Sequence, residues 1–478
     1  MARVPGGCEG SARSAACLTS GGASCRSARR RSPRRMSRRE TWLVVIDRFD
    51  PELSPRTPAW RAPRSRSPAA TICEWLDIPR GIPRLLVTGT IGTGKTTELQ
   101  RIAEERSGKE FVVFVDLERH CTDVVHDAQA IERVSPWEVC FLMGVALLRA
   151  AEERLAYHLP DEHRKDLEKR WAALASRTGQ DTPPQIDIAS LAKSMVVLAS
   201  TAAAGAPAAV GAGLQVLKAG TEAVRWTAPF GKTQKALADQ ESDVQALLDC
   251  VNTLIGLVQQ RGSRILFIID GLDRIRDFNR AKALFIDSVL ISQLACPLVI
   301  CGPFALRHHP ATAAIRGFHD VPSLVNEPVL RKDAPKELGP GVAFFRELFT
   351  RRVSDLPGGP DLFTAEQIDK LAYYSGGRAR EFVKFVFRIA GLAYREDLAQ
   401  VTDELMERVL EEARRQRETG LHKGHIQTLE EIARDPDHRL PEGHLAQELL
   451  SYGTLLPYPN DSEWYFPHPL LLRHMIKL

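Results

Sequence analysis

The sequence predicts an α/β fold built on a parallel sheet, followed by a helical region and a C-terminal hairpin. Three observations carry this prediction. An apolar run at 85–88 comes directly before the glycine-rich segment 89–96, and a helix-type run follows that segment. A second apolar run lies at 111–115, and a third at 265–269 ends at Asp270. Short apolar runs separated by helical segments predict βαβ units, whose strands are parallel.

The whole-chain composition is that of an ordinary globular protein. The 478 residues are enough for two or three domains, and 26% are charged. The net charge of +4 argues neither for nor against nucleic acid as a partner. The nine cysteines include no C-x-x-C pair, which argues against a zinc site and favours reduced thiols. We therefore expect a cytoplasmic protein.

Residues 1–70 differ from the rest of the chain. They contain many arginines and no lysine, and the first lysine of the chain is Lys95. We predict a disordered head, basic and rich in proline, because this composition cannot bury a core. An organelle transit peptide, a nucleic-acid-binding arm and a translation start at Met36 are the alternatives. Residues 42–49 are the first that could pack.

The glycine-rich segment 89–96 reads G-x-x-x-x-G-K-T, the pattern of a phosphate-binding loop. Its glycines let the backbone N–H groups point at phosphate oxygens, and the following helix N-terminus adds partial positive charge. Lys95 would reach the β- and γ-phosphates, and the Thr96 hydroxyl would bind Mg²⁺. A glycine-rich turn that matches by chance is the alternative, and the flanking strand and helix argue against it. The predicted nucleotide-binding residues here are Gly89, Gly92, Thr93, Gly94, Lys95, Thr96 and Thr97.

An acidic side chain ends the apolar run at 265–269. In an open α/β sheet, ligands bind at the carboxyl ends of the strands, which is where Asp270 would lie. We predict that Asp270 holds Mg²⁺ opposite Thr96. An ordinary buried strand with a capping aspartate is the alternative. The next apolar strand, 297–301, offers Cys301 as a candidate to sense the γ-phosphate.

A helical and Ala/Gly-rich insert separates the two phosphate-site motifs, at about 137–238 within a core of 71–330. Within it, residues 195–217 are uncharged and long enough to span a bilayer. Alanine, glycine and Pro207 make their transfer into lipid unfavourable. We interpret this stretch as a soluble, mobile insert, with a membrane segment as the alternative.

Two further blocks follow the core. Residues 339–418 read as a helical lid, in which a glycine pair precedes Arg378 and Arg380 at the start of a helix. These arginines could deliver a cation to a phosphate, or could simply be solvated after a turn. Residues 425–478 read as two helices and a hairpin, which indicates a winged-helix-like domain. Its second helix, at 442–452, contains no Lys or Arg, which favours packing or regulation over DNA binding.

Several of these motifs resemble a known family. G-T-I-G-T-G-K-T-T at 89–97 and I-I-D-G-L-D-R at 268–274 resemble the STAND NTPases within the AAA+ group. Gly271 directly after the carboxylate, with Asp273 two places later, is similar to the NACHT-type Walker B pattern. S-G-G-R-A-R at 375–380 resembles the lid of origin-recognition-like AAA+ ATPases.

The resemblance implies a site that binds ATP and Mg²⁺. Lys95, Asp270 and Asp273 would be its catalytic residues. Arg378 or Arg380 would report the nucleotide state from the lid. Gly271 stands where the family usually has a catalytic glutamate, so hydrolysis is expected to be slow. Arg307 and Arg316 are candidates for an arginine finger.

The expected function is an ATP-binding, slowly hydrolysing molecular switch that changes conformation or assembly to signal to a partner protein or to another copy of itself. A DNA-associated AAA+ ATPase of the replication-initiator or transposition-helper type is the alternative, and the non-basic helix at 442–452 makes DNA the less favoured partner. A membrane-associated KAP-like NTPase is the second alternative, because KAP-type inserts carry membrane helices. The poor transfer energy of 195–217 argues against a membrane.

Overall fold

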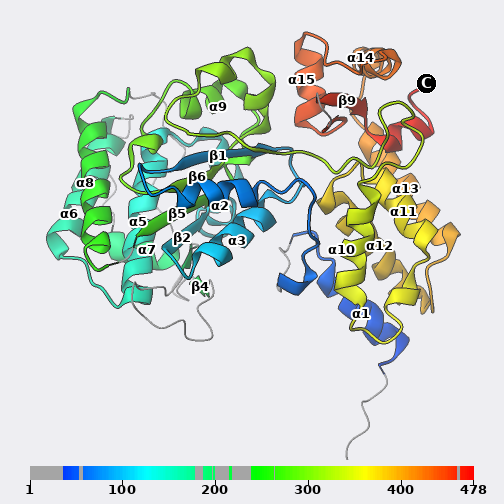
Figure 1. Ribbon diagram of the computed structural model, residues 1–478, viewed down its shortest axis with the longest axis horizontal. Coiled ribbons are helices and arrows are strands. Elements are labelled where there is room, and N and C mark those ends of the chain that lie inside the picture. Colours follow the sequence, from blue (N-terminus) through cyan, green and yellow to red (C-terminus); the bar gives the residue numbers. More distant parts are fainter. Residues whose placement is uncertain are drawn as a thin grey trace, which may run out of the picture.

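The computed structural model describes residues 36–52, 58–177, 187–195, 197–199, 215–217, 238–262, 264–459 and 463–477. Figure 1 shows an α/β lobe beside a group of helices, with the C-terminal helices and hairpin above that group. The predicted fold class is confirmed, because a mainly parallel sheet is followed along the chain by a helical region.

The core sheet has seven strands in the order β4-β3-β2-β5-β6-β1-β7. Strands β2, β5, β6, β1 and β7 are parallel to one another, and β3 and β4 add an antiparallel edge beside β2. Strand β6 lies between β1 and β5. At the carboxyl ends of these strands, Cys301 is therefore placed between the phosphate-binding loop and Asp270. The strands are β1 (Arg84–Gly89), β2 (Phe111–Asp116), β3 (Val197–Ala199), β4 (Gln215–Leu217), β5 (Ile265–Asp270), β6 (Leu298–Cys301) and β7 (Ser323–Leu324).

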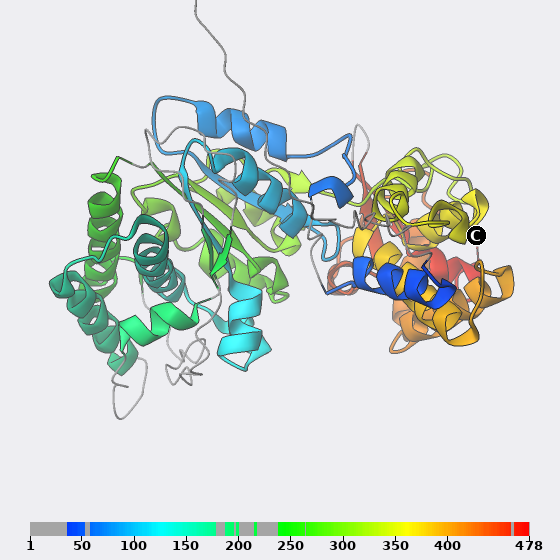
Figure 2. The same cartoon turned by 90° about the horizontal axis from the view of Figure 1, so that it is seen from below.

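Helices cover both faces of this sheet, as parallel strands require. Along β5, Leu266 and Ile268 pack with α2 and α3, whereas Phe267 and Ile269 pack with helices of the other face. Figure 2 shows α2 and α3 on one side of the strands and the longer helices on the other. The helices of the core are α2 (Ala69–Asp77), α3 (Lys95–Arg106), α4 (Leu117–Arg119), α5 (Pro136–Leu155), α6 (Asp161–Arg177), α7 (Ile188–Ser194), α8 (Ser242–Gln259) and α9 (Phe278–Phe285).

Two short parts of the predicted insert 195–217 are strands. The segment contributes β3, which pairs with β2, and β4, which pairs with β3, so part of it is sheet edge. The β-prone run at 197–199 pairs with the open edge of β2. Residues 200–214 lie outside the described residues. In the part of the chain that the structure describes, no helix is long and apolar enough to cross a membrane.

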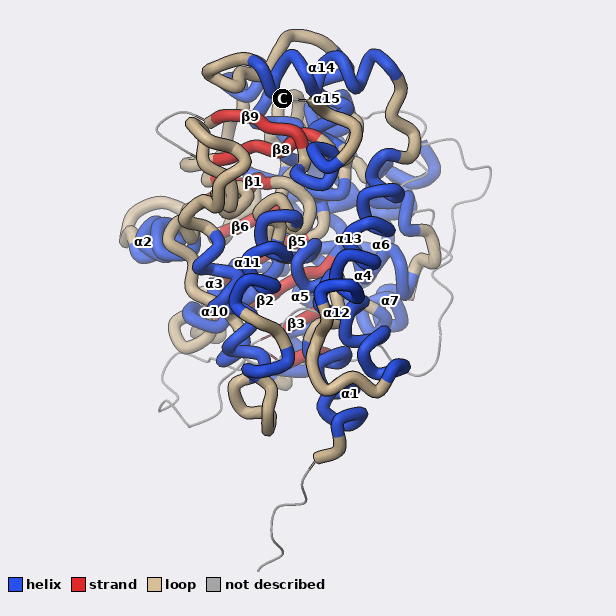
Figure 3. Tube along the Cα trace, turned by 90° about the vertical axis from the view of Figure 1, so that its right-hand side faces the viewer, coloured by secondary structure: helices blue, strands red, loops and turns tan. Residues whose placement is uncertain are grey.

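Four helices form the lid, and a helix pair with a hairpin follows it. We call residues 423–477 the wing. Its hairpin pairs β8 with β9 antiparallel, at the positions that the sequence predicts, and Figure 3 shows both strands beside α14 and α15. The lid helices are α10 (Val342–Val353), α11 (Ala365–Tyr374), α12 (Ala379–Glu396) and α13 (Asp403–Glu418). The wing consists of α14 (Lys423–Arg434), α15 (His444–Ser451), β8 (Leu455–Tyr458) and β9 (Trp464–Pro467).

An N-terminal helix corrects the prediction of a disordered head for the described part of residues 1–70. Helix α1 (Arg38–Arg48) starts at a capping box formed by Ser37 and Glu40. It packs on the lid, next to α12 and α10, and apart from the core sheet (Figure 1). Its apolar face is buried in the core of the lid. The run at 42–49 has helical spacing, which the short stretch alone did not reveal. Residues 1–35 lie outside the described residues.

Trp42 anchors this helix, and its removal tests the arrangement. The side chain is fully buried, and its Nε1 donates to the carbonyl oxygen of Leu398 at 2.8 Å. We expect Trp42→Ala to destabilise the lid by about 3–5 kcal/mol, as large-to-small substitutions of buried aromatics do. Thermal unfolding followed by circular dichroism measures this loss. Leu43→Ala is the matched control, because Leu43 is 48% exposed on the same helix. Equal effects of the two substitutions would contradict the packing of α1 on the lid.

Candidate nucleotide-binding site

The phosphate-binding loop joins β1 to α3. Gly92 and Gly94 have φ of +90° and +104°, a backbone conformation that glycine adopts readily. At Gly89 a side chain is excluded by a steric clash, because its Cβ would lie 2.3 Å from the carbonyl oxygen of Leu324. Gly94 is the N-cap of α3, and the helix begins at Lys95. The loop thus has the strand–loop–helix context in which backbone N–H groups and a helix N-terminus bind phosphate.

The Lys95 side chain is buried, and the protein itself supplies partners for all of its hydrogen-bond donors. Its Nζ donates to the carbonyl oxygens of Gly89 and Thr90, each at 2.8 Å. It also forms an ion pair with Asp273, at 2.8 Å from Oδ2. An ammonium group has three donors, so all three are engaged. A phosphate must therefore replace contacts that the loop now makes with itself and with Asp273.

Asp270, Asp273 and Cys301 meet at the carboxyl edge of the sheet, where one ligand atom from each lies within 4.8 Å of the others. Burial, with the nearby Asp273 and Asp116, raises the pKa of Asp270 to about 7. Burial alone would raise the pKa of Asp273, but the Lys95 ammonium, together with the guanidinium groups of Arg274 and Arg380, outweighs burial and lowers that pKa. Burial also raises the pKa of Cys301 well above its usual value, so this thiol is neutral.

Oxygen atoms at this edge fit a hard divalent cation. The Thr96 hydroxyl donates a hydrogen bond to Asp270, which brings the two predicted Mg²⁺ ligands together. Asp273 adds a second carboxylate, and carboxylate and hydroxyl oxygens are the donors that Mg²⁺ prefers. The neutral Cys301 thiol is a poor Mg²⁺ ligand. The carboxylate of Asp116, paired in register with Asp270 across β2 and β5, is a neighbour that the sequence reasoning missed.

The lid touches the loop through the glycine–arginine turn. The Arg378 Nε donates to the carbonyl oxygen of Ile91 at 2.9 Å. The backbone N–H of Arg380 donates to the carbonyl oxygen of Gly92 at 3.0 Å. The turn also packs on the backbone of Glu327, which requires glycine at 377, because its φ is +80° and a Cβ there would lie 2.0 Å from the carbonyl oxygen of Glu327. Both predicted arginines therefore reach the loop, Arg378 by its side chain and Arg380 by its backbone.

Two buried side chains at the loop have no local sequence signal. Arg64, which lies in the predicted disordered head, donates to the carbonyl oxygen of Thr93 and pairs with Glu327 at 2.8 Å. Asn326 accepts a hydrogen bond from the Thr90 hydroxyl at 2.8 Å. Its Nδ2 donates to the carbonyl oxygen of Pro457 in the wing at 3.0 Å. Asn326 therefore ties the loop to β8.

A small cavity of about 110 Å³ lies over the loop. Pockets for small molecules usually measure about 300–1,000 Å³, so a nucleotide needs this cavity to widen. The walls that could move come from the segment before the core and from the lid. The cavity is lined by Asp50, Pro51, Glu52, Ile91, Gly92, Gly94, Lys95, Thr96, Thr97, Glu118, Asp273, Arg274, Arg352, Ala379, Arg380 and Val383.

Other predicted residues lie near the loop or apart from it. Thr93 is fully buried, and its hydroxyl donates to the carbonyl oxygen of Thr90 at 2.9 Å. Thr97 lines the small cavity. Arg307 pairs with Glu463 of the wing at 2.7 Å, and Arg316 is exposed. Neither of these two arginines lines the cavity over the loop.

No family model matches this chain, and no curated protein matches its sequence. The ADP form of the ORC2 protein of Aeropyrum pernix aligns over 89% of this chain and 94% of its own, with 12% identity and a TM-score of 0.39. The Aeropyrum pernix ORC1 protein in complex with DNA aligns over 90% and 96%, with 13% identity and a TM-score of 0.37. RuvB of Thermotoga maritima covers 48% of this chain and 82% of its own, with 13% identity and a TM-score of 0.25.

At these TM-scores the similarity carries no functional assignment. None of the three neighbours is described as a STAND or NACHT protein, so that part of the resemblance stays a prediction.

Proposed function

We propose that this protein is an ATP-binding, slowly hydrolysing, Mg²⁺-dependent switch of the AAA+ type, in which the lid and the wing change position with the nucleotide state. One observation carries the proposal. The lid hydrogen-bonds the carbonyl oxygens of Ile91 and Gly92, inside the loop whose N–H groups would receive the phosphates. A ligand that reshapes this loop changes the surface on which the lid rests.

The residues around the loop support a hydrolytic role. Lys95 would exchange Asp273 for phosphate oxygens, which it neutralises. Thr96 and Asp270 would hold Mg²⁺, which supplies further charge neutralisation on the phosphates. Asp273, released from Lys95, could accept a proton from the attacking water. Gly271 offers no side chain for this task, which is consistent with slow turnover.

The wing is linked to the same loop. Asn326 joins Thr90 to β8 of the wing, and both of its hydrogen bonds are buried. Buried hydrogen bonds are costly to break without replacement, so a shift of Thr90 favours a shift of the hairpin. The link supports a switch in which nucleotide binding reaches the C-terminal residues.

The switch is tested by light scattering after size exclusion, together with amide hydrogen exchange. The states compared are no nucleotide, ADP and a non-hydrolysable ATP analogue, each with Mg²⁺. We expect the ATP analogue to change exchange at the start of α12 and in β8, or to change the oligomeric state. Identical exchange and mass in all three states would overturn the proposal.

A DNA-associated ATPase is the second candidate. The order helix, helix, hairpin in the wing supports it, because winged helices often bind DNA. Two observations oppose it. Helix α15 has no Lys or Arg. It also lines a cavity of about 560 Å³ that the wing forms with the core, so this part of the helix faces the protein. Duplex binding measured at several salt concentrations tests it. A steep loss of affinity with salt would favour this candidate.

The wing contacts the core through the short helix Phe304–His308, which follows β6. The Nδ1 of His308 lies 3.2 Å from the hydroxyl of Tyr465, and Arg307 pairs with Glu463 at 2.7 Å. Burial lowers the pKa of His308 to about 4, and Arg307 adds to this effect while Glu463 opposes it. His308 is therefore neutral at pH 7, and its protonation would disturb the contact.

This histidine gives the stability a predictable dependence on pH. Because its folded pKa lies below the unfolded value of about 6.5, its contribution is complete above pH 6.5 and is lost as the pH falls toward 4. Between pH 7 and pH 5 the expected loss is about 2 kcal/mol. Scanning calorimetry should show a smaller drop in Tm over this range for His308→Asn than for the wild type. His158→Asn is the control, because the His158 side chain is 69% exposed. If the Tm of His308→Asn falls as much as the Tm of the wild type over this pH range, the prediction is contradicted.

A further inference from the structure

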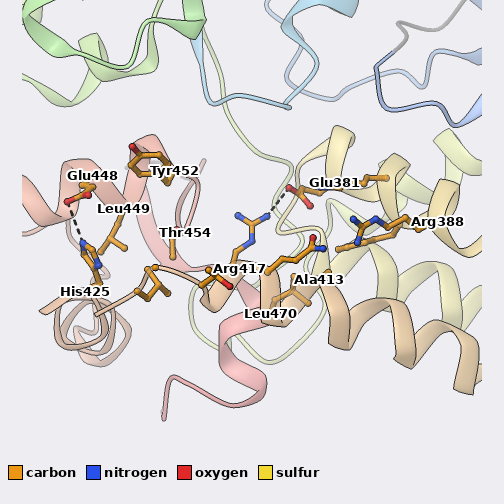
Figure 4. A pocket seen from close by; sticks show the side chains of 16 residues that line it. Glu381, Arg388, Ala413, Arg417, His425, Glu448, Leu449, Tyr452, Thr454 and Leu470 are labelled. Carbon is orange, nitrogen blue, oxygen red and sulfur yellow. Dashed lines mark hydrogen bonds and ion pairs between the residues drawn. The ribbon is translucent and has the colours of Figure 1, made fainter. Parts of the chain in front are cut away.

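A further cavity, of about 480 Å³, lies between the lid and the wing. We call it the lid–wing cavity. Residues of α12 and α13 form one side, and residues of α14 and α15 form the other (Figure 4). Its volume falls within the range of pockets that bind small molecules, whereas the cavity over the phosphate-binding loop does not.

The acidic side chains that line this cavity already have partners. The Oε1 of Glu381 accepts a hydrogen bond from Arg417 at 2.8 Å, and the Nη1 of Arg378 lies 3.9 Å from the same oxygen. Glu448 lies 3.4 Å from the Nε2 of His425 (Figure 4). Arg417 and Arg378 act on the Glu381 carboxylate more strongly than Lys384 does. The lining holds three cations, Lys384, Arg388 and Arg417, against these two carboxylates.

Two cations of α12 remain. Lys384 and Arg388 are four residues apart, so they share one face of the helix, and like charges at this spacing repel each other. Arg388 pairs with Glu412 at 3.5 Å, but the Glu412 side chain is 59% exposed and does not line the cavity. Lys384 has no ion pair within the ranges that the structure describes. An anion bound between the two side chains would remove this repulsion.

The rest of the lining is largely apolar. Ring and aliphatic groups from both the lid and the wing face the cavity, among them Phe385, Leu421, Leu449, Tyr452 and Leu470. We propose that the lid–wing cavity binds a small organic anion, with its charged group between Lys384 and Arg388 and its apolar body against these side chains.

Binding in this cavity would reach the phosphate-binding loop. Arg417 donates to Glu381 of the lid and to the carbonyl oxygen of Gly453 in the wing, at 3.0 Å. Arg378 lies against the same glycine, where an added Cβ would be 2.5 Å from its Nη1, and it also donates to Ile91 of the loop. A ligand that fixes the lid against the wing thus fixes Arg378. This coupling rests on the proposed switch, whereas the anion site does not.

The first experiment measures binding of a defined probe to the full chain without nucleotide. The probe is 1-anilinonaphthalene-8-sulfonate, an aromatic anion that fluoresces in apolar surroundings. The comparison ligand is N-phenyl-1-naphthylamine, which has the same rings without the sulfonate. We expect one saturable site for the anion and at least about tenfold weaker binding of the neutral compound, because a lost charge contact of about 1.4 kcal/mol is tenfold in affinity.

Two variants locate the site. Lys384→Gln with Arg388→Gln removes both charges at similar side-chain length, and we expect the affinity for the anion to fall at least about tenfold. Ala413→Phe fills the cavity and should abolish binding while leaving the charges in place. Arg395→Gln, on the same helix but outside the cavity lining, is the matched control. The proposal is overturned if the double variant binds the anion like Arg395→Gln, or if the neutral compound binds equally well. Tm values confirm that each variant folds.

The coupling has its own readout. The affinity for a non-hydrolysable ATP analogue is measured with and without saturating anion. Linkage requires that each ligand change the affinity of the other by the same factor. We expect a change of about fivefold or more, lost in the double variant. Anion binding with no effect on the analogue would overturn the coupling alone, whereas absence of analogue binding would overturn the proposed function.

Discussion

Replacing Lys95 with alanine is expected to abolish nucleotide binding, with a loss of affinity of at least about a hundredfold for a non-hydrolysable ATP analogue. The ammonium lies among the carbonyl oxygens of the loop and the carboxylate of Asp273. Truncating one partner of a buried charge pair costs about 2–5 kcal/mol, and about 2.7 kcal/mol is a hundredfold in affinity. The substitution removes the cation that would meet the phosphates and leaves Asp273 without its partner.

Titration calorimetry with Mg²⁺ present measures the loss. Lys109→Ala is the matched control, because Lys109 follows the same helix and its side chain is 60% exposed. Thermal unfolding separates a folding defect from a binding defect. If Lys95→Ala binds the analogue as tightly as Lys109→Ala does, the loop is not the nucleotide site and the proposed function is wrong.

The second large effect is expected for Asp270→Asn. This side chain accepts the Thr96 hydrogen bond, and its loss would remove the carboxylate best placed for Mg²⁺. A catalytic metal supplies several kcal/mol of transition-state stabilisation, so we expect hydrolysis to fall by about a hundredfold to a thousandfold. Because Lys95 and the loop amides remain, analogue binding without Mg²⁺ should stay near the wild-type value.

Phosphate release at several Mg²⁺ concentrations measures this effect. Asp287→Asn, whose side chain is 53% exposed and pairs with Lys282, is the control. Asp273→Asn separates the two carboxylates, because it frees Lys95 for phosphate while removing the proposed proton acceptor. It should therefore bind the analogue at least as well as the wild type and hydrolyse ATP more slowly. Wild-type hydrolysis in Asp270→Asn would contradict the Mg²⁺ assignment.

The sequence predicted the parts of this site that are continuous along the chain. The loop at 89–96 and the strand ending at Asp270 each carry their own pattern, and the parallel sheet brings them together. The glycine–arginine turn at 375–380 was also recognisable, and the structure places it against the loop. The catalytic and ligand roles of these residues stay predictions until the substitutions are measured.

The sequence did not predict contacts that depend on distant partners. Asn326 sits in an irregular segment with no motif, yet it joins Thr90 to Pro457. Arg64 lies in a stretch whose composition indicates disorder, and its burial depends on Glu327, which is 263 positions away. Composition and periodicity report the local chain, and they do not report which surface an isolated side chain will meet.

The position of α1 determines when, during translation, this helix can be buried. Trp42 is translated 356 positions before Leu398, the residue to which its ring nitrogen donates. At about 5–20 residues per second, the ribosome needs roughly 20–70 s to cover that distance. During this time the sheet can form, but the apolar face of α1 has no lid to cover it, so it is open to chaperones and to other nascent chains. Among the helices that the structure describes, the one that is synthesised first is therefore among the last to be buried.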